Sequence, residues 1–298
     1  MELKELIHPL EVLEVVGNAD VEISGIQSDS RKVEKGFLFV AVRGTAVDGH
    51  AYIQSAIEKG AAAIVCEEIP VLPDENMQVS ESKPVFIRVK DSADALGKSL
   101  SAWYENPSDN LILVGVTGTN GKTTTKELLA SVLSTKYNLL YTEGNLNNHI
   151  GVPLTLLRLT HDHEMAVIEM GASHPGDIKE LVDIAQPNYG IITNVGRAHL
   201  EGFGSFEGVI KTKGELYDYM RRTKGKIFIN QDNQYLTDIA KGIEQVTYGS
   251  DETAFAWGCV VSSNPYLTFE WKQQGKIHTV ETHLIGSYNL DKVLAAVA

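Results

Sequence analysis

The segment that most constrains the fold is a glycine-rich stretch between an apolar run and a helical one. Residues 111–116 read LILVGV, which is typical of a buried strand, and residues 117–121 read TGTNG. Residues 122–134, KTTTKELLASVLS, have the periodicity of a helix. Its apolar positions are Leu128, Leu129, Val132 and Leu133. A strand, a glycine turn and a helix in this order predict one unit of an α/β fold.

The same stretch has the composition of a phosphate-binding loop. Gly118 and Gly121 let backbone N–H groups converge on a phosphate, and the helix that follows adds its dipole. Lys122 would reach terminal phosphates, and Thr123 would hold Mg²⁺. The usual pattern requires Gly four residues before the Gly-Lys pair, where this chain has Val116. A plain strand-to-helix turn needs glycine but has no need of Gly-Lys-Thr, which favours the phosphate loop.

Further short β-branched runs follow along the chain. They cover residues 166–170 (AVIEM), 189–195 (YGIITNV) and 226–230 (KIFIN), and helical stretches such as GDIKELVDIA separate them. This alternation predicts a mostly parallel sheet flanked by helices on both faces. Because ligands of such sheets bind beyond the carboxyl ends of the strands, we expect functional residues just after each strand.

Polar residues occur at those positions. Glu169 ends an apolar run and His199 follows the run 189–195, so each is either a member of a satisfied polar pair or a metal ligand. Their position beyond strands near the phosphate loop favours a metal site. Lys211 and Lys213 form either a solvated helix face or functional cations, and periodicity singles out neither. Asn145, in the loop GNLNNHIGVP, serves either a substrate or a helix cap.

Residues 1–105 predict a smaller α/β unit. Residues 36–42 (GFLFVAV) form a strand candidate, Gly60 stops a helix that precedes another strand, and an Asp or Ser caps the helix in DSADALGKSLSAWYENP. The turn-rich segment 105–110 marks a boundary, which gives domains 1–105 and 106–298. Within SDSRKV, Arg31 and Lys32 either anchor an anionic ligand or form a weak surface pair with Asp29.

The composition narrows the class of protein. Apolar residues make up 43% and charged residues 22% of 298 residues, as in soluble globular proteins, and a net charge of −13 argues against nucleic-acid or anionic-membrane binding. The sequence shows neither a secretory signal nor an apolar run of membrane-spanning length, so we expect a cytoplasmic protein without membrane insertion. Cys66 and Cys259 are expected to be buried thiols.

Taken together, the segments resemble the Mur ligase family, the ATP-dependent amino-acid-adding enzymes of peptidoglycan precursor synthesis. The resemblance covers nearly the whole chain and rests on SDSRKVEKGFLFVAVRGTAVDGHAYI, GVTGTNGKTTT, GNLNNHIGVPLTLLRL, IEMGASHPGDI, TNVGRAHLEGFGSFEGVIKTKGELY, INQDN and LIGSYNLDKVLAAVA. The phosphate loop of this family reads Gly-Thr-x-Gly-Lys-Thr/Ser, so Val116 agrees with it. The resemblance implies a small substrate domain followed by a phosphate-loop central domain.

The resemblance also implies roles for particular residues. The catalytic residues would be Lys122, Lys213 and His199. Contacts with ATP would come from Gly118, Thr119, Asn120, Gly121, Lys122, Thr123, Thr124 and Asn289. Magnesium would be held by Thr123, Glu169, His199 and, as a carbamate, Lys213. The UDP-linked substrate would be held by Ser28, Ser30, Arg31, Thr45, Ala46 and Asn145. Where the family pattern usually has a second Asn after Asn289, this chain has Lys292.

The chemistry implied by the resemblance needs ATP and Mg²⁺ but no protein nucleophile. ATP would phosphorylate the terminal carboxylate of a UDP-N-acetylmuramoyl peptide, and the amine of an amino acid or dipeptide would attack the acyl phosphate. Positioning and electrostatics would supply the rate enhancement. We expect a monomer with these small molecules, rather than nucleic acid, as its partners.

Two departures from the family pattern affect the expected reaction. Residues 1–123 are most similar to the family members that add diaminopimelate or lysine, and residues 124–298 to those that add D-alanyl-D-alanine, so a chimaera is one hypothesis. The chain stops where the family's third domain would begin, and we expect ligation by this chain to be weak or absent.

Four functional readings follow, and the addition of D-alanyl-D-alanine to a UDP-N-acetylmuramoyl-tripeptide is favoured. The alternatives are addition of diaminopimelate or lysine, a nucleotide-binding module without ligase activity, and the related folate-polyglutamate ligase. The set Lys122, Glu169, His199 and Lys213 argues against a mere binding module, and the SDSRKV domain argues against the folate enzyme.

Overall fold

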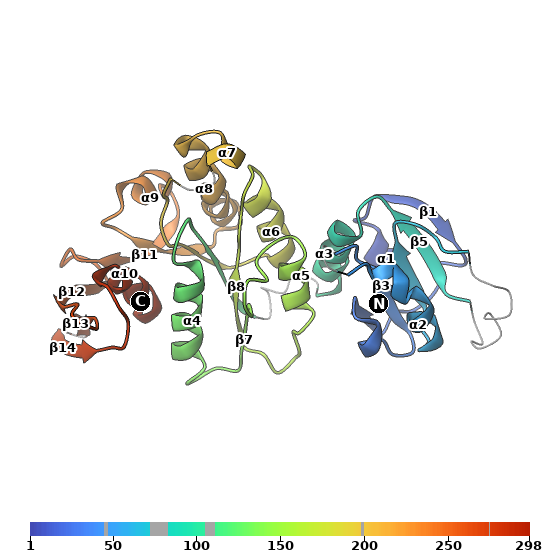
Figure 1. Cartoon of the computed structure of the whole chain (residues 1–298), viewed down its shortest axis with the longest axis horizontal. Coiled ribbons are helices and arrows are strands. Elements are labelled where there is room, and N and C mark those ends of the chain that lie inside the picture. The colour runs from blue at the N-terminus through green and yellow to red at the C-terminus, as the bar shows by residue number, and fades with distance from the viewer. Residues whose placement is uncertain (45–46, 72–82, 105–110, 198–199, 274) are drawn as a thin grey trace. The chain divides into compact units, whose positions relative to one another are not determined.

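A computed structural model describes residues 1–44, 47–71, 83–104, 111–197, 200–273 and 275–298 (Figure 1). The chain divides into two compact units, which we describe separately. The first unit comprises Met1–Asn106 and His149–Arg158, and the second comprises Pro107–Asn148 and Leu159–Ala298. This division groups the short segment His149–Arg158 with the first unit, whereas the predicted domain limits assign it to residues 106–298.

The first unit is built on a five-stranded sheet with the strand order β1-β5-β4-β3-β2. The strands are β1 (Val12–Val16), β2 (Gly25–Gln27), β3 (Phe37–Val40), β4 (Ala63–Cys66) and β5 (Val85–Val89). β1 pairs antiparallel with β5, whereas the other neighbours are parallel. The helical elements are α1 (Leu3–Ile7), η1 (Ser30–Lys32), η2 (Gly49–Tyr52), α2 (Ile53–Glu58), α3 (Ser92–Trp103) and α5 (Gly151–Leu156).

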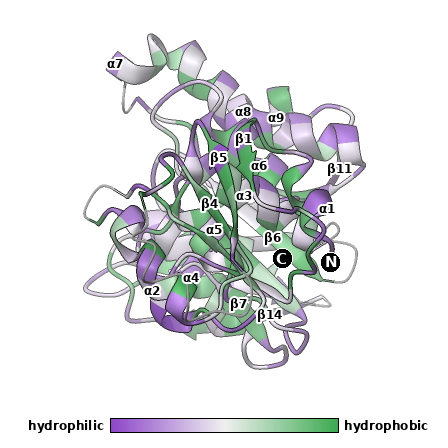
Figure 2. Cartoon of the chain, turned by 90° about the vertical axis from the view of Figure 1, so that its right-hand side faces the viewer, coloured by the Kyte–Doolittle hydropathy of each residue, from purple (hydrophilic) through white to green (hydrophobic). Residues whose placement is uncertain are grey.

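Alternate residues of the strands pack on opposite faces of this sheet. Leu38 and Val40 belong to an apolar cluster that includes side chains of α1 and α3, whereas Phe39 belongs to a second cluster that includes side chains of α2. This is the period of two that a pleated strand imposes. Both faces are therefore covered, and the strands β4 and β5 are accordingly largely hydrophobic in Figure 2.

The second unit is built on a nine-stranded sheet with the order β14-β13-β12-β11-β10-β9-β6-β8-β7. The strands are β6 (Ile112–Thr117), β7 (Leu139–Tyr141), β8 (Met165–Glu169), β9 (Tyr189–Ile192), β10 (Lys226–Asn230), β11 (Glu244–Gly249), β12 (Ala256–Ser262), β13 (Thr268–Gln273) and β14 (Lys276–Glu281). Strands β6 to β12 are parallel to one another, and β12, β13 and β14 form an antiparallel extension. The helical elements are α4 (Lys122–Leu133), α6 (Asp177–Ala185), α7 (Leu200–Phe203), α8 (Phe206–Thr223), α9 (Gln234–Ile239), η5 (Ser287–Asn289) and α10 (Leu290–Val297).

Helices cover both faces of this larger sheet. Val114 and Val116 of β6 pack in a cluster with Leu129 of α4, whereas a Cβ on Gly115 would meet Leu216 of α8. Because successive residues of a strand face opposite ways, α4 and α8 lie on opposite faces. The predicted α/β class, with parallel-rich sheets flanked by helices, is therefore confirmed.

The chain reverses its direction of travel across this sheet between β6 and β9. From β6 the chain runs through α4 to β7, on one side, and from β9 it runs through α8 to β10, on the other. The adjacent carboxyl ends of β6 and β9 therefore form a switch point of the kind at which open α/β sheets bind ligands.

The observed elements lie at the predicted segments where the pattern is local, although β9 ends at Ile192, three residues before the end of the predicted run 189–195. β10 spans the predicted residues 226–230, and Asp91 caps α3 by accepting hydrogen bonds from the N–H groups of Ala93 and Asp94 at 2.9 and 3.0 Å. Two expectations need correction. Val132, part of the expected apolar face of α4, is 44% exposed, and Cys259 is only partly buried because it lies on the antiparallel extension. Within the described ranges, no helix has the length and apolar character to cross a membrane.

Candidate nucleotide and metal site

The glycine-rich segment forms a backbone cradle between β6 and α4. Gly118 and Gly121 have φ values of +141° and +80°, which L side chains rarely adopt. A Cβ on Gly118 would also lie 2.0 Å from Oγ1 of Thr193. Thr123 and Thr124 occupy the first turn of α4, where N–H groups are free of helical partners. The predicted phosphate loop therefore has both the conformation and the helix N-terminus that bind an anion.

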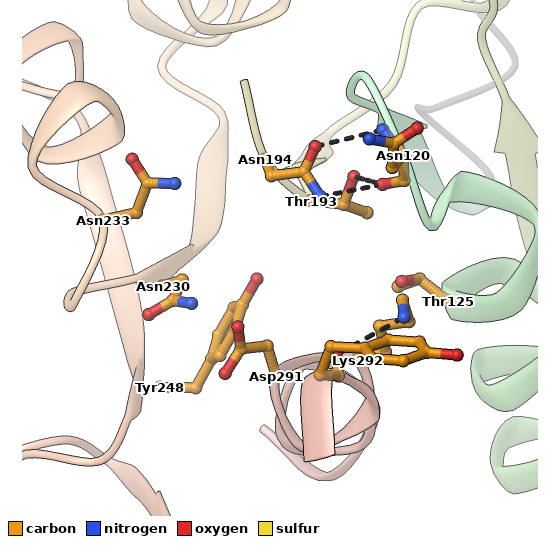
Figure 3. A pocket seen from close by; sticks show the side chains of 10 residues that line it. Asn120, Thr125, Thr193, Asn194, Asn230, Asn233, Tyr248, Asp291 and Lys292 are labelled. Carbon is orange, nitrogen blue, oxygen red and sulfur yellow. Dashed lines mark hydrogen bonds between the residues drawn. The ribbon is translucent and has the colours of Figure 1, made fainter. Parts of the chain in front are cut away.

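Residues that follow β9 hold this cradle in place (Figure 3). The Asn194 side chain accepts a hydrogen bond from Asn120 N and donates one to Asn120 O, both at 3.0 Å. Oγ1 of Thr193 donates to the same carbonyl at 2.7 Å. Thr193 and Asn194 were not singled out from the sequence, because only the pairing of β6 with β9 brings them to the loop.

Lys122 folds back over the cradle. Its ammonium donates hydrogen bonds to the carbonyl oxygens of Gly118 and Thr119 at 2.9 and 3.1 Å, and it forms no ion pair with a described residue. Burial lowers the pKa of Lys122, and the charge of Glu169 partly offsets that effect. A partly desolvated ammonium with only carbonyl partners gains most from an anion such as a phosphate.

Glu169 supplies a buried carboxylate beside the loop. Its side chain is 1% exposed, and its Oε1 accepts hydrogen bonds from Thr123 Oγ1 at 3.2 Å and Asn147 Nδ2 at 2.8 Å. Its Oε2 has no hydrogen-bond partner among the described residues. A buried carboxylate oxygen without a partner is costly, and a carboxylate beside a hydroxyl suits a hard cation. These residues therefore fit the predicted Mg²⁺ site.

The other predicted metal ligands are His199 and the carbamate of Lys213. His199 lies outside the described residues. Among the residues that are described, no three or more His, Cys, Asp or Glu side chains gather into a metal-binding group. A magnesium site here would therefore draw on hydroxyl, water or modified-lysine ligands in addition to Glu169.

The structure separates the two lysines that periodicity left equivalent. Lys211 is exposed, whereas Lys213 is 2% exposed, with its Nζ 3.4 Å from Ala172 O and 5.4 Å from the centre of the Phe203 ring. Burial, with a further contribution from the charge of Lys122, lowers the pKa of Lys213 to about 8. Lys213 is thus the lysine directed into the protein, and its amine loses its proton readily.

A cavity of about 410 Å³ adjoins the cradle on its α10 side (Figure 3). It is lined by Asn120, Thr125, Thr193, Asn194, Asn230, Asn233, Tyr248, Tyr288, Asp291 and Lys292. Its size suits a small-molecule ligand. Asn289, expected from the resemblance to contact adenine, is not among these residues. Its amide instead donates to Ile285 O at 2.9 Å and accepts from Lys292 at 2.7 Å.

The residues expected to bind the UDP-linked substrate do not form a described cluster like the one around the phosphate loop. Ser30 is buried at the start of η1, and Ser28 is partly buried. The Arg31 guanidinium is engaged with Asp29, to which it donates hydrogen bonds at 2.8 and 2.9 Å, and this pair lowers the pKa of Asp29 to about 2. Thr45 and Ala46 lie outside the described residues. Asn145, in the second unit, is exposed.

A parallel sheet, a glycine cradle at its switch point, and a lysine, hydroxyl and carboxylate around that cradle define a phosphate-loop protein of the nucleotide-binding α/β class. The match to known families is more specific. Residues 116–298 match the Mur ligase middle domain, and residues 22–104 match the Mur ligase family catalytic domain. The chain belongs to the Mur ligase family, and the resemblance inferred from its motifs is confirmed.

Individual relatives of two kinds are similar to this chain. The UDP-N-acetylmuramoyl-tripeptide–D-alanyl-D-alanine ligase of Haemophilus influenzae is 37% identical over 292 residues, which cover 95% of this chain and 61% of that protein. The UDP-N-acetylmuramoyl-L-alanyl-D-glutamate–2,6-diaminopimelate ligase of Parabacteroides distasonis is 45% identical over 237 residues, 73% of this chain and 46% of that protein. The crystal structure of the MurF ligase of Thermotoga maritima in complex with ADP has a TM-score of 0.74 and 31% identity, over 92% of this chain and 61% of that one.

The alignments with these relatives concern the length of the chain and the hypothesis that it is a chimaera of residues 1–123 and 124–298. This chain spans 61% of the Haemophilus protein and 46% of the Parabacteroides protein. The alignment with the D-alanyl-D-alanine ligase covers 95% of the chain, so similarity to that kind extends well beyond residues 124–298. That the two halves differ in their resemblance stays a prediction.

Proposed function

We propose that this chain provides the UDP-substrate-binding and ATP-binding parts of a ligase that adds D-alanyl-D-alanine to UDP-N-acetylmuramoyl-tripeptide. The observation that carries the proposal is the buried Glu169 carboxylate, whose Oε2 lacks a partner among the described residues, next to Thr123 and the phosphate loop. The 37% identity to a ligase of that specificity supports the choice of step, and the ADP complex of the Thermotoga relative supports ATP as the nucleotide.

In this proposal each residue has a definite task. Lys122 exchanges its two carbonyl partners for phosphate oxygens of ATP, and the N–H groups of the cradle hold the same phosphates. Thr123 and Glu169 hold Mg²⁺, which when bound offsets the negative charge of the transferring phosphoryl group. The substrate carboxylate displaces ADP to form an acyl phosphate. The incoming amine then displaces phosphate and loses a proton to give the amide.

Lys213 acts in this proposal as a carbamate. Carbamylation adds CO₂ to a neutral amine and releases one proton, so it is favoured by the lowered pKa of about 8. The product carries a carboxylate-like group, a suitable ligand for a hard cation. This would convert a buried cation that lacks an ion pair with any described residue into an anionic group that interacts with the charge of Lys122.

The remaining parts of the proposal come from the resemblance. Residues 1–105 would bind the UDP-linked substrate through Ser28, Ser30, Arg31, Thr45 and Ala46, with Asn145 from residues 106–298. His199 would join the metal site, and Asn289 would act at the adenine end through its contact with Lys292. A monomer acting in the cytoplasm on these small molecules completes the proposal.

Substrate binding and phosphate release test the proposal together. We expect calorimetry to give tighter binding of UDP-N-acetylmuramoyl-tripeptide than of the dipeptide, and phosphate release, however slow, to require ATP, the tripeptide and D-alanyl-D-alanine. Binding or release only with the dipeptide and diaminopimelate would favour the second candidate, which the 45% identity to a diaminopimelate ligase supports. Nucleotide binding without affinity for either UDP substrate would indicate a binding module instead.

A further inference from the structure

A second lysine, from α10, reaches the phosphate loop at Gly121. Lys292, in the first turn of α10, packs so closely on the cradle that a Cβ on Gly121 would lie 2.5 Å from its Cε and 3.7 Å from its Nζ. The same side chain lines the cavity beside the loop (Figure 3). Lys292 is therefore a cation in contact with the loop backbone.

The partners of Lys292 are neutral. Its ammonium donates hydrogen bonds to Asn289 Oδ1 at 2.7 Å and Tyr288 O at 3.4 Å, and it lies 4.4 Å from the centre of the Tyr288 ring. It forms no ion pair with a residue in the described ranges, although the chain has a net charge of −13 and Asp291 precedes it. Partial burial lowers its pKa. A partly desolvated cation without an anionic partner is suited to an anionic ligand.

A buried hydroxyl in the same cavity points to the same ligand. Thr125 is fully buried, lines the cavity, and has an Oγ1 without a hydrogen-bond partner among the residues that the structure describes. Thr125 lies four residues after Gly121, on the α4 turn that Lys292 approaches in Figure 3. A hydroxyl with no internal partner can donate to an oxygen of a bound molecule.

The two lysines mark opposite ends of the cradle. Lys122 turns toward the carbonyls of Gly118 and Thr119. The charge of Glu169 acts on Lys122, and the charge of Lys122 acts on Lys213, so this is the end at which the phosphoryl transfer is proposed. Lys292 lies at the other end, at Gly121, and shares its cavity with aromatic and amide side chains suited to a nucleoside. A nucleotide with its terminal phosphate at Lys122 therefore has its nucleoside on the Lys292 side.

We propose that Lys292, assisted by the Thr125 hydroxyl, binds the phosphate of ATP nearest the ribose and so fixes the direction in which the nucleotide lies. This inference rests on the proposed function, because it takes ATP to be the ligand of the phosphate loop. The two lysines then hold the phosphate chain from its two ends. Lys122 acts at the reacting phosphate and Lys292 at the nucleoside-linked one.

The test compares Lys292→Met, which keeps the aliphatic stem but not the charge, with Lys292→Arg and the exposed control Lys241→Met. ADP affinity is measured by calorimetry, and AMP and adenosine are measured as competitors of a fluorescent ADP analogue. Loss of a charged hydrogen bond predicts a roughly tenfold weaker affinity of Lys292→Met for both ADP and AMP, with adenosine unchanged. Lys292→Arg retains most of the affinity, Lys241→Met retains all of it, and Thr125→Val loses a smaller share.

Each other outcome overturns the inference in a recognisable way. A loss confined to ADP would place Lys292 at a terminal phosphate, and an equal loss for adenosine would make its role one of packing. Unchanged affinity for all three ligands would remove Lys292 from the site. Failure of the unaltered chain to bind ADP would refute the proposed function itself, together with this inference. Thermal unfolding of each variant confirms that it is folded.

Discussion

Both units carry charged side chains near the carboxyl ends of parallel strands, and those of the first unit form ion pairs with one another. There, Arg43 reaches Glu67 at 3.1 Å and Asp48 at 3.4 Å. Glu67 in turn accepts hydrogen bonds from the N and Oγ of Ser92 at 3.1 and 2.8 Å, and its own N–H donates to His50 Nε2 at 2.9 Å. The network is satisfied by the chain itself and links Arg43, Glu67 and Ser92.

In the described part of the second unit, the charges beside the phosphate loop lack ion-pair partners. Lys122 has only backbone carbonyls, Glu169 keeps one carboxylate oxygen without a partner among the described residues, and Lys213 has a carbonyl at 3.4 Å. Burial lowers the pKa of both lysines. A network of paired charges stabilises its own unit, whereas buried charges without ion pairs destabilise the free protein and are stabilised when a ligand binds.

The largest expected effect is a gain in stability on replacing Lys213 with Met. A pKa of about 8 in the folded chain, against the ordinary 10.5, corresponds to a cost of about 3 kcal/mol while the amine is protonated. Because the folded pKa is the lower one, this cost is present in full below pH 8 and disappears as pH rises toward 10.5. Urea unfolding in CO₂-free buffer should therefore show Lys213→Met more stable at pH 7, with the difference shrinking to about 1 kcal/mol near pH 10.

The matched control for that prediction is Lys211→Met on the exposed face of the same helix, α8. It should leave the free energy of unfolding almost unchanged at both pH values. A gain that is equal for the two variants, or independent of pH, would contradict the claim that Lys213 is a strained buried cation.

The next effect concerns Lys122. Its replacement with Met removes a charged hydrogen bond proposed for the terminal phosphate, worth about 1.5–3 kcal/mol, so affinity for a non-hydrolysable ATP analogue should fall roughly 10- to 150-fold. Titration calorimetry measures this loss, with Lys211→Met again as the control. An unchanged affinity would mean that the cradle binds the nucleotide without a contribution from Lys122.

In the first unit, a substitution in the paired network is expected to lower stability, by less than Lys213→Met raises it. Ser92→Ala removes the hydroxyl that donates to Glu67 and accepts from Arg43 N at 3.1 Å, and Ser92 is 1% exposed. Unfolding should become easier by about 1–2 kcal/mol, while ADP affinity stays the same. Ser263→Ala on the exposed surface is the control. A Ser92→Ala variant as stable as the unaltered chain would contradict the claim that the paired network stabilises the first unit.

The smallest effect is expected at Thr125. Thr125→Val replaces a fully buried hydroxyl, which has no partner in the described part of the chain, with a methyl group of similar shape. Thermal and urea unfolding should show the free protein stabilised by about 1 kcal/mol. Destabilisation would show that the hydroxyl has a structural partner, and would weaken its assignment to a ligand.

How far the sequence reveals the site depends on the range of the contacts. The phosphate loop is a local pattern, because its glycines, its lysine and the adjoining strand and helix are contiguous. The cavity is not, since parallel pairing and the packing of α10 on α4 bring Asn230, Tyr248 and Lys292 to Asn120. Only packing decides which of Lys211 and Lys213 faces inward. The antiparallel extension from β12 to β14 was not predicted, although residues 267–281, LTFEWKQQGKIHTVE, largely alternate apolar and polar side chains around a glycine, as is typical of a hairpin.

We expect the unpaired charges around the phosphate loop to bind a nucleotide together with Mg²⁺. Calorimetric titration of ADP, with and without Mg²⁺, into the unaltered chain and into Glu169→Gln tests this expectation. We predict that Mg²⁺ tightens ADP binding to the unaltered chain and has little effect on the variant. Binding that is absent, or that responds equally to Mg²⁺ in both proteins, would contradict the claim.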